Sequence, residues 1–309
     1  MAQSAQSETP DEEGAVRLRF QRWQREVGHH WPEFAAEFVG TAFLLLCVLT
    51  AVSWMFGATS PLPRLLPSIG LRLLITGLLL GCAGGLVAIT PLGRLSGAHL
   101  NPALSLSFTI LGKMRPPDLV GYVLAQCSGA ILGAWVGSVI WHRMASTVHD
   151  AVNLPGAGIS IPVALLGEVV ATFLLVEAIL VFVSHHATMR WTPLIVAFVV
   201  MVLVWGDGNI SGAGMNPARS LGPAVIAQLW TPYWLYAVGP LLGGTLAAAV
   251  HRLALPFEVK TAKLFHDVHY RSIFSGPADH AANQHVRSQH GQAAGATPPP
   301  RTRVPPLQK

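Results

Sequence analysis

The sequence predicts an all-α membrane protein with six transmembrane helices and two re-entrant half-helices, arranged as an inverted repeat. The composition is 51% hydrophobic and only 11% charged, whereas about a quarter of the residues in a typical soluble domain are charged. Six apolar runs are each about as long as a bilayer requires. Two further apolar stretches begin at an Asn-Pro pair and are too short to cross, which is typical of re-entrant segments.

The elements follow in order along the chain. Residues 1–32 are polar, with acidic residues followed by arginines, so they predict an N-terminal cytoplasmic segment and a retained first span rather than a cleaved signal. A membrane-embedded domain is predicted over residues 33–254. Its spans are expected at 33–56, 67–90, 117–141, 162–183, 191–206 and 232–254, and its re-entrant stretches near 101–111 and 216–228.

The C-terminal segment, residues 255–309, is predicted to be a cytoplasmic tail. From about residue 264 onward it is rich in His, Pro, Gln and Ser and has no hydrophobic periodicity. Such a composition cannot bury enough apolar surface to offset the entropy of ordering. The tail is therefore predicted to be disordered.

The basic residues set the predicted orientation. They cluster in the N-terminal segment, after the first re-entrant stretch, at Arg190 and after the last span, while the segment between spans three and four offers mainly Arg143. Lys and Arg are enriched in cytoplasmic loops, so both termini are predicted to be cytoplasmic. The formal charge of +5 is explained by an anionic membrane surface, and no nucleic-acid partner is predicted.

An internal repeat supports this layout. A glutamate opens a similar run in each half, at Glu37 and at Glu168, and each is followed later by Ser-Gly-Ala-x-x-Asn-Pro-Ala. The repeats cover about residues 33–141 and 162–254. Because each half contains three spans, the two copies must have opposite orientations in the membrane.

The paired Asn-Pro-Ala segments carry the chemistry. They are Asn101, Pro102 and Ala103 in the first half, and Asn216, Pro217 and Ala218 in the second. Proline suits the first position of a helix, so each motif should begin a short helix. If the loops enter from opposite faces, two positive helix N-termini meet near the midplane beside the asparagine amides. This arrangement repels cations, and a water molecule that accepts from both amides cannot relay protons.

The doubled motif, its Ser-Gly-Ala flanks, the repeat and the span count resemble the aquaporin or major intrinsic protein family. The resemblance covers roughly residues 33–254. A single Asn-Pro-Ala is usually an ordinary helix cap, but two copies in corresponding places are specific. The resemblance implies a passive channel for water and small neutral solutes, a homotetramer in the cell membrane with one pore per subunit, and no cofactor.

The resemblance also implies roles for individual residues. Asn101 and Asn216 match the central pore donors, and Glu37 and Glu168 match glutamates that brace the re-entrant loops. His99 is expected to hydrogen-bond within its loop, and a pH-sensitive pore contact stays open as an alternative. A count back from each asparagine without gaps gives a four-residue selectivity filter of Gly81, Val204, Ala213 and Arg219.

This predicted filter consists of small, apolar residues apart from its arginine. It does not decide which solute the channel conducts. Water-selective members place an aromatic residue and a histidine at the first two positions, so the departure favours glycerol, urea or ammonia beside water. Glycerol-type members commonly have Asp after the arginine, whereas this chain has Ser220. Leu80 and Gly84 remain alternatives on span two, and Trp205 on span five would make the filter narrow.

Two other classes of function stay open from the residues alone. A secondary transporter also uses inverted repeats and half-helices, and Glu177 within span four is a candidate for ion coupling. A non-conducting structural membrane protein is the second alternative. An enzyme is not predicted, because the sequence shows no nucleophile motif and no metal-spaced cluster of His and Cys; neither catalytic residues nor a metal site are expected.

Overall fold

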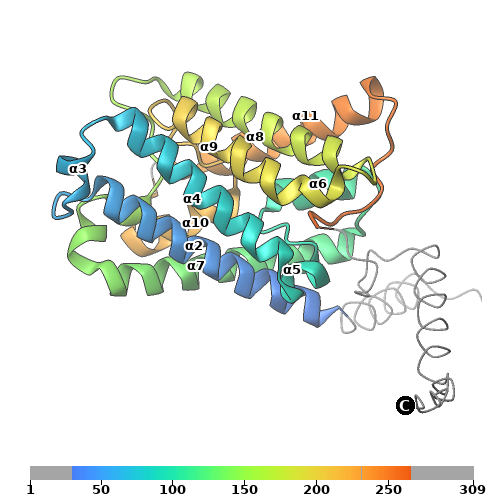
Figure 1. Cartoon of the computed structure of the whole chain (residues 1–309), viewed down its shortest axis with the longest axis horizontal. Coiled ribbons are helices and arrows are strands. Elements are labelled where there is room, and N and C mark those ends of the chain that lie inside the picture. Colours follow the sequence, from blue (N-terminus) through green and yellow to red (C-terminus); the bar gives the residue numbers. More distant parts are fainter. Residues whose placement is uncertain (1–29, 231, 266–309) are drawn as a thin grey trace, which may run out of the picture.

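The computed structural model describes residues 30–230 and 232–265, and this part of the chain is helical without strands (Figure 1). Six helices are long and apolar enough to cross a bilayer, which confirms the predicted all-α fold with six spans. They are α2 (Trp31–Phe56), α4 (Ile69–Ile89), α7 (Pro116–Ser146), α8 (Ile161–Val183), α9 (Thr192–Asp207, continuing the 3-10 turn η2, Met189–Trp191) and α11 (Tyr233–Ala254).

Two short helices, α6 (Pro102–Ile110) and α10 (Pro217–Ala227), begin at the prolines of the Asn-Pro-Ala motifs. At 1.5 Å per residue they are about 14 Å and about 17 Å long, roughly half of a hydrocarbon core about 30 Å thick. They are the half-helices that the sequence predicts. The connections contain α3 (Leu62–Leu65), α5 (Pro91–Ser96) and the 3-10 turn η1 (His149–Ala151).

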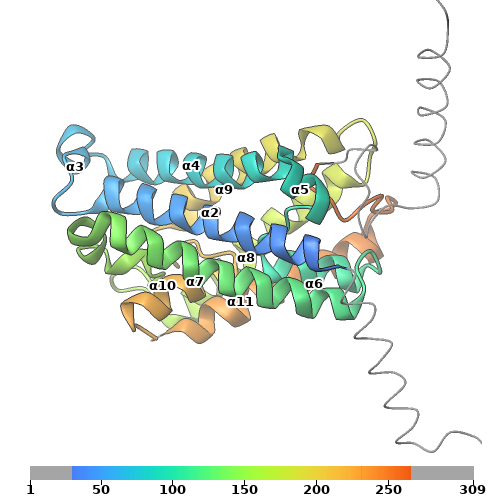
Figure 2. The ribbon, with the colours of Figure 1, turned by 90° about the horizontal axis from the view of Figure 1, so that it is seen from below.

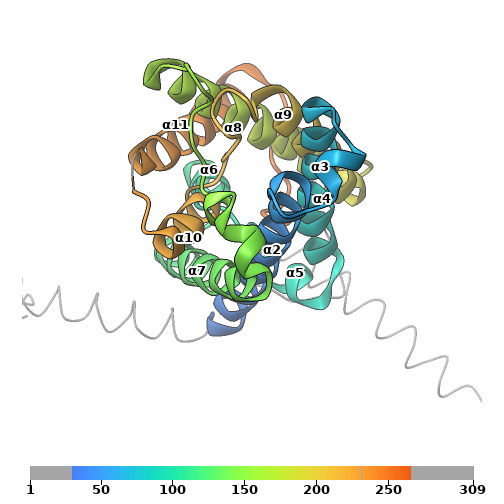
Figure 3. The ribbon, with the colours of Figure 1, turned by 90° about the vertical axis from the view of Figure 1, so that its left-hand side faces the viewer.

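The long helices run side by side (Figures 1 and 2), and seen end-on they form a ring (Figure 3). In the first half α2 packs on α7, and in the second half α8 packs on α11, so the first and third long helices pair in both. The middle helices, α4 and α9, pack on each other across the two halves. Both half-helices contact α7 and α11. This pattern is that of the predicted inverted repeat.

Glycines allow the closest approaches between the long helices. A Cβ atom on Gly133 of α7 would lie 2.1 Å from the carbonyl oxygen of Ala42 on α2. In the second half, a Cβ atom on Gly243 of α11 would lie 2.4 Å from the carbonyl oxygen of Val169 on α8, which matches the 2.3 Å between Gly129 and Phe38 in the first half. Small residues at these crossings let the backbones touch, as is common for helices in membranes.

The outer surface of the bundle is apolar, while several polar side chains are buried inside it. Glu37, Gln126 and Glu168 are fully buried. Large apolar side chains cover the outside of the long helices, among them Leu124, Trp135, Val139, Leu166, Leu194 and Leu242. A bundle with six helices of spanning length and such an apolar exterior requires a lipid environment, so this is a membrane protein.

Both ends of the described chain lie at one end of the bundle (Figure 1), as an even number of spans requires. We call this the tail end, and we call the opposite end, with α3 and η1, the filter end. Residues 255–265, here named the strap, turn back from α11 onto the bundle. The structure differs from the predicted disorder in this segment, because Val259, Ala262 and Leu264 are buried. The predictions for residues 1–29 and 266–309 lie outside the described residues.

Candidate pore and its re-entrant loops

The two loops that precede α6 and α10 have the same backbone conformation. In each, the glycine of Ser-Gly-Ala has a φ angle near +90°, at Gly97 (+91°) and Gly212 (+93°), which glycine adopts without strain. The following alanine and the residue before the asparagine also have positive φ angles: Ala98, Leu100, Ala213 and Met215. These turns leave several backbone N–H groups in each buried loop without helix partners, so they need acceptors from elsewhere.

Glu37 of α2 supplies the acceptors for the first loop. Its Oε1 accepts from the Ser96 hydroxyl at 2.7 Å and from the His99 backbone N–H at 3.0 Å. Its Oε2 accepts from the Leu100 N–H at 2.7 Å and from the Gln126 amide of α7 at 2.8 Å. The carboxylate therefore joins the first loop to α2 and α7 through four hydrogen bonds.

Glu168 of α8 does the same in the second loop. Its Oε1 accepts from the Ser211 hydroxyl at 2.7 Å and from the Gly214 N–H at 2.6 Å, and its Oε2 accepts from the Met215 N–H at 2.7 Å. Charge-assisted bonds of this kind are about twice as strong as neutral ones. Each half therefore holds its loop by one glutamate from its own first helix.

Two tyrosines also hold the loops, and sequence reasoning missed this role. Tyr122 of α7 donates its hydroxyl to the Ser96 carbonyl oxygen at 2.5 Å, and Tyr236 of α11 donates to the Ser211 carbonyl oxygen at 2.5 Å. Both tyrosines are buried and lie at matching places in the two halves. A comparison of the two repeats beyond the glutamate and Ser-Gly-Ala would have found the pair.

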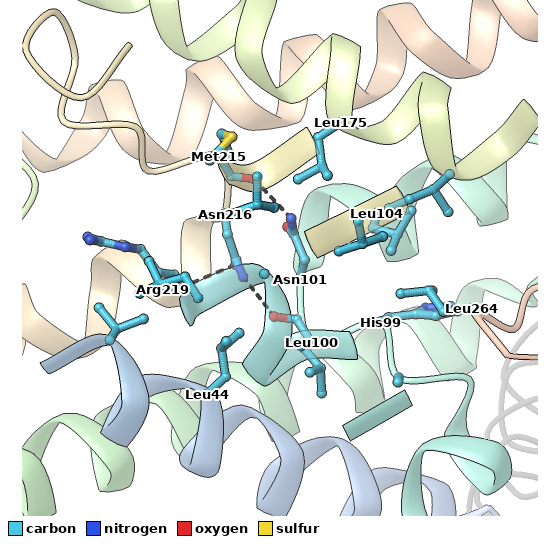
Figure 4. A pocket seen from close by; sticks show the side chains of 18 of the residues that line it. Leu44, His99, Leu100, Asn101, Leu104, Leu175, Met215, Asn216, Arg219 and Leu264 are labelled. Atoms are coloured by element: carbon cyan, nitrogen blue, oxygen red, sulfur yellow. Dashed lines mark hydrogen bonds between the residues drawn. The ribbon is translucent and has the colours of Figure 1, made fainter. Parts of the chain in front are cut away.

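The asparagines bind across the two halves. Asn101 donates from Nδ2 to the Met215 carbonyl oxygen at 2.9 Å, and Asn216 donates from Nδ2 to the Leu100 carbonyl oxygen at 2.8 Å (Figure 4). Their Oδ1 atoms accept from the first N–H groups of α6 and α10, such as that of Ala103 at 2.9 Å. An amide nitrogen carries two hydrogens. These contacts leave one N–H on each asparagine for the space between the half-helices.

That space is a cavity of about 100 Å³, here named the central cavity (Figure 4). Asn101 and Asn216 line it, together with Arg219 on the side of the filter end and His99 on the side of the tail end. A second cavity of about 250 Å³, the outer cavity, lies at the filter end. The residues that line both are Leu80, Ala213 and Arg219, so they form the boundary between the cavities.

Arg219 is 8% exposed and is held by the loop between the two halves. Its Nη1 donates to the Ala151 carbonyl oxygen at 3.2 Å and to the Asn153 Oδ1. Asn153 also accepts from the Ser220 hydroxyl at 2.9 Å and donates to the Gly212 carbonyl oxygen at 2.7 Å. Asn153 thus fixes the arginine against the second re-entrant loop. Nothing in its sequence context, a loop without periodicity, signals this contact.

The filter residues predicted by counting fall in two groups. Val204 lines the outer cavity, while Ala213 and Arg219 line both cavities. Gly81 lines the central cavity, but a Cβ atom on it would lie 2.5 Å from the Ala197 Cα of α9, so its side-chain position faces that helix. Leu80 is the α4 residue that lies at the boundary beside Arg219.

His99 and Glu177 occupy different parts of the bundle. His99 is 3% exposed, with Nδ1 3.0 Å from the Ser105 hydroxyl and Nε2 2.8 Å from the Ala262 carbonyl oxygen in the strap. Glu177 does not line the central cavity; it lies 3.0 Å from Nδ1 of His251 between α8 and α11. The contact with His251 gives this intramembrane carboxylate a structural partner.

Six spans, two opposed half-helices and a cavity between their N-termini define a membrane channel with re-entrant loops. A family model described as "Major intrinsic protein" matches residues 24–251, so the chain belongs to the major intrinsic protein family. Channels of this family carry water or small solutes passively across membranes and are not enzymes.

Known relatives agree with this assignment. The chain is similar to Aquaporin-8 of Notomys alexis, with 38% identity over 186 residues, 58% of this chain and 69% of the relative. It is also similar to Aquaporin AqpM of Methanothermobacter marburgensis, with 34% identity over 236 residues, 70% of this chain and 94% of the relative. Among solved structures, the aquaglyceroporin from Plasmodium falciparum has the same fold, with a TM-score of 0.59, 20% identity and coverage of 73% of this chain and 96% of that one.

Proposed function

We propose that this protein conducts water, with glycerol, urea and ammonia as further candidate solutes, and that it excludes protons and other ions. The observation that carries the proposal is the pair of asparagine amides, each with one N–H left over, at the N-termini of two opposed half-helices. A water molecule whose oxygen accepts from both amides cannot also accept a hydrogen bond from the next water molecule in the pore. The hydrogen-bonded chain that would relay protons is then interrupted.

The charges around the pore support exclusion of cations. Each half-helix N-terminus carries about half a positive charge, and the Arg219 guanidinium lies at the boundary of the two cavities. None of the described residues that line the central cavity is acidic. A cation in this space would lose its hydration shell without gaining a compensating carboxylate.

The width of the pore depends on the residues at the boundary. We propose Leu80, Val204, Ala213 and Arg219 as the filter, with Leu80 in the place that counting gives to Gly81. Three of these side chains are apolar, and none is aromatic. Such a filter offers few hydrogen bonds to a passing solute, which favours small neutral molecules over ions.

The proposal also covers the membrane, the orientation and the oligomeric state of the channel. We propose a channel domain over residues 33–254 in the cell membrane, with both termini and the tail end in the cytoplasm. The Lys and Arg distribution supports this orientation. We also propose a homotetramer with one pore per subunit, and no cofactor.

Osmotic challenge of proteoliposomes tests the proposal. Vesicles with the protein are expected to shrink several-fold faster than protein-free vesicles in stopped-flow light scattering, with a low activation energy. When the external osmolyte is glycerol or urea, recovery of volume reports passage of that solute. Rates equal to those of protein-free vesicles, both for this protein and for variants that widen its pore, would refute the channel.

A matched pair of variants tests the filter. Leu80→Trp fills the boundary beside Arg219 and is expected to lower water and glycerol passage. Leu253→Trp makes the same substitution at a side chain that is 84% exposed on α11, and it should leave both rates unchanged. If Leu80→Trp conducts like the parent, the proposed filter position on α4 is wrong.

A further inference from the structure

The strap, residues 255–265, reaches into the pore at the tail end. Leu264 is 4% exposed and lines the central cavity, on the same side as His99 (Figure 4). It lines this cavity together with Asn101 and Asn216, although it comes after the last span. The wall of the central cavity therefore includes a side chain that belongs to neither repeat.

Hydrogen bonds fix the strap to the first re-entrant loop. The Leu264 N–H donates to the Gly97 carbonyl oxygen at 3.0 Å. The Ala262 carbonyl oxygen can only accept, so Nε2 of His99, at 2.8 Å, must carry the proton. Nδ1 of the neutral ring then accepts from the Ser105 hydroxyl at 3.0 Å. His99 thereby joins the strap to the loop that presents Asn101.

The strap has further attachments along its length, and at its inner end the Arg94 guanidinium lies over the Phe265 ring, 5.2 Å from its centroid. The Lys260 N–H donates to the Val183 carbonyl oxygen at the end of α8, at 3.2 Å. Lys113 and Glu258 form an ion pair at 2.7 Å, and the Glu258 side chain is 77% exposed. The ammonium of Lys113 lowers the pKa of Glu258, so the pair is intact at neutral pH. An exposed pair of this kind contributes little to stability.

The first re-entrant loop also has attachments that do not involve the strap. Glu37, Tyr122 and the asparagine bonds between the halves hold the first re-entrant loop without any strap atom. These contacts would remain if the strap were displaced. This combination, a pore-lining side chain on a separately attached segment, is that of a plug.

We propose that the strap is a built-in plug, in which Leu264 closes the tail end of the pore and is withdrawn when the channel opens. This inference rests on the proposed conduction of water. An apolar side chain in a narrow passage blocks water by removing its hydrogen-bond partners as well as its space, as in hydrophobic gates.

Substitution of Leu264 in the full chain tests the plug. Leu264→Ala shortens the side chain and is expected to raise water permeability per protein in proteoliposomes by about threefold or more. Leu264→Trp is expected to lower it. Leu253→Ala makes the matched substitution on the lipid-facing side of α11 and should match the parent. If Leu264→Ala yields no monodisperse protein, Leu264→Val is expected to give a smaller rise.

The outcomes separate the plug from the channel itself. Equal permeability of the parent and the Leu264 variants, all above protein-free vesicles, would overturn the plug and leave the channel intact. A lower permeability of Leu264→Ala would also overturn it, since the strap would then be a supporting wall. If neither the parent nor any Leu264 variant exceeds protein-free vesicles, the proposed conduction of water fails.

Discussion

At the scale of single residues, two buried carboxylates decide whether the pore can exist. The loops before α6 and α10 have backbone N–H groups that no helix satisfies, in a region without bulk water. Glu37 and Glu168 accept from these groups and bring a charge that the surrounding donors stabilise. Their role is structural, and it is coupled to function because they set the positions of the asparagines.

Glu37→Gln should therefore destabilise the protein although the shape of the side chain is preserved. The glutamine NH₂ group would point at N–H or O–H donors that the carboxylate oxygen accepts from in the native protein. At least one buried donor would then lack a partner, at a cost of about 1–3 kcal/mol. The thermal stability in detergent is measured as the temperature at which half of the monodisperse chromatographic peak is lost. This temperature is expected to fall, and water permeability is expected to fall with it.

Glu258→Gln is the matched control for this prediction. Glu258 pairs with Lys113 at the surface. Because this pair lowers the pKa of Glu258, its contribution is present above the unfolded pKa and lost as the pH falls through the lower folded value. It is also small for an exposed pair. Near-parental thermal stability is expected, and equal losses in both variants would argue against the bracing role of Glu37.

At the scale of helices, the contact between α2 and α7 depends on the absence of side chains. Gly129 and Gly133 of α7 lie against the backbone of α2, at the carbonyl groups of Phe38 and Ala42. Helices in a bilayer gain little from burying apolar surface against each other, because lipid is also apolar. Close backbone packing is then a main source of association.

Gly133→Ala should force α2 and α7 apart, since the new Cβ atom would lie 2.1 Å from the Ala42 oxygen. Overpacking of this kind costs about 1–3 kcal/mol. Gly206→Ala is the control, because no atom lies within 4 Å of its Cβ position in α9, and alanine favours a helix over glycine by about 1 kcal/mol. Thermal stability in detergent should fall for the first variant only; a parallel fall in both would refute the packing argument.

At the scale of the whole molecule, the even number of spans puts both described chain ends on one side, and the proposed orientation assigns that side to the cytoplasm. An impermeant maleimide should therefore label Ala58→Cys at the filter end of intact cells. Lys260→Cys, in the strap, should react only after lysis. The native cysteines to be replaced first are Cys47, Cys82 and Cys127. The reverse labelling pattern would invert the proposed topology.

Much of this architecture could be predicted from sequence because lipid imposes simple rules. Apolar runs of spanning length gave the six long helices, and Asn-Pro gave the starts of α6 and α10. Glu37 and Glu168 could be singled out because a carboxylate within an apolar run is costly in a membrane, which indicates a specific role. These features depend on local composition and on the repeat.

The remaining features depend on contacts between distant segments. The count from Asn101 back to α4 passes through α5, where the chain leaves the long helix, so it could not distinguish Gly81 from Leu80. Asn153 is brought to Arg219 by the loop between the halves. The strap does contain apolar residues, but the place where they pack, such as that of Leu264 at the central cavity, is set by the bundle and not by the strap's own sequence.

The reciprocal bonds of the asparagines also bear on how the protein is made. Asn101 finds its carbonyl partner at Met215, 114 residues later in the chain. At about 5–20 residues per second of synthesis, the first half waits on the order of ten seconds for that acceptor. Neither half of the chain can form the central cavity alone, so the cavity is assembled only after the second half has been made.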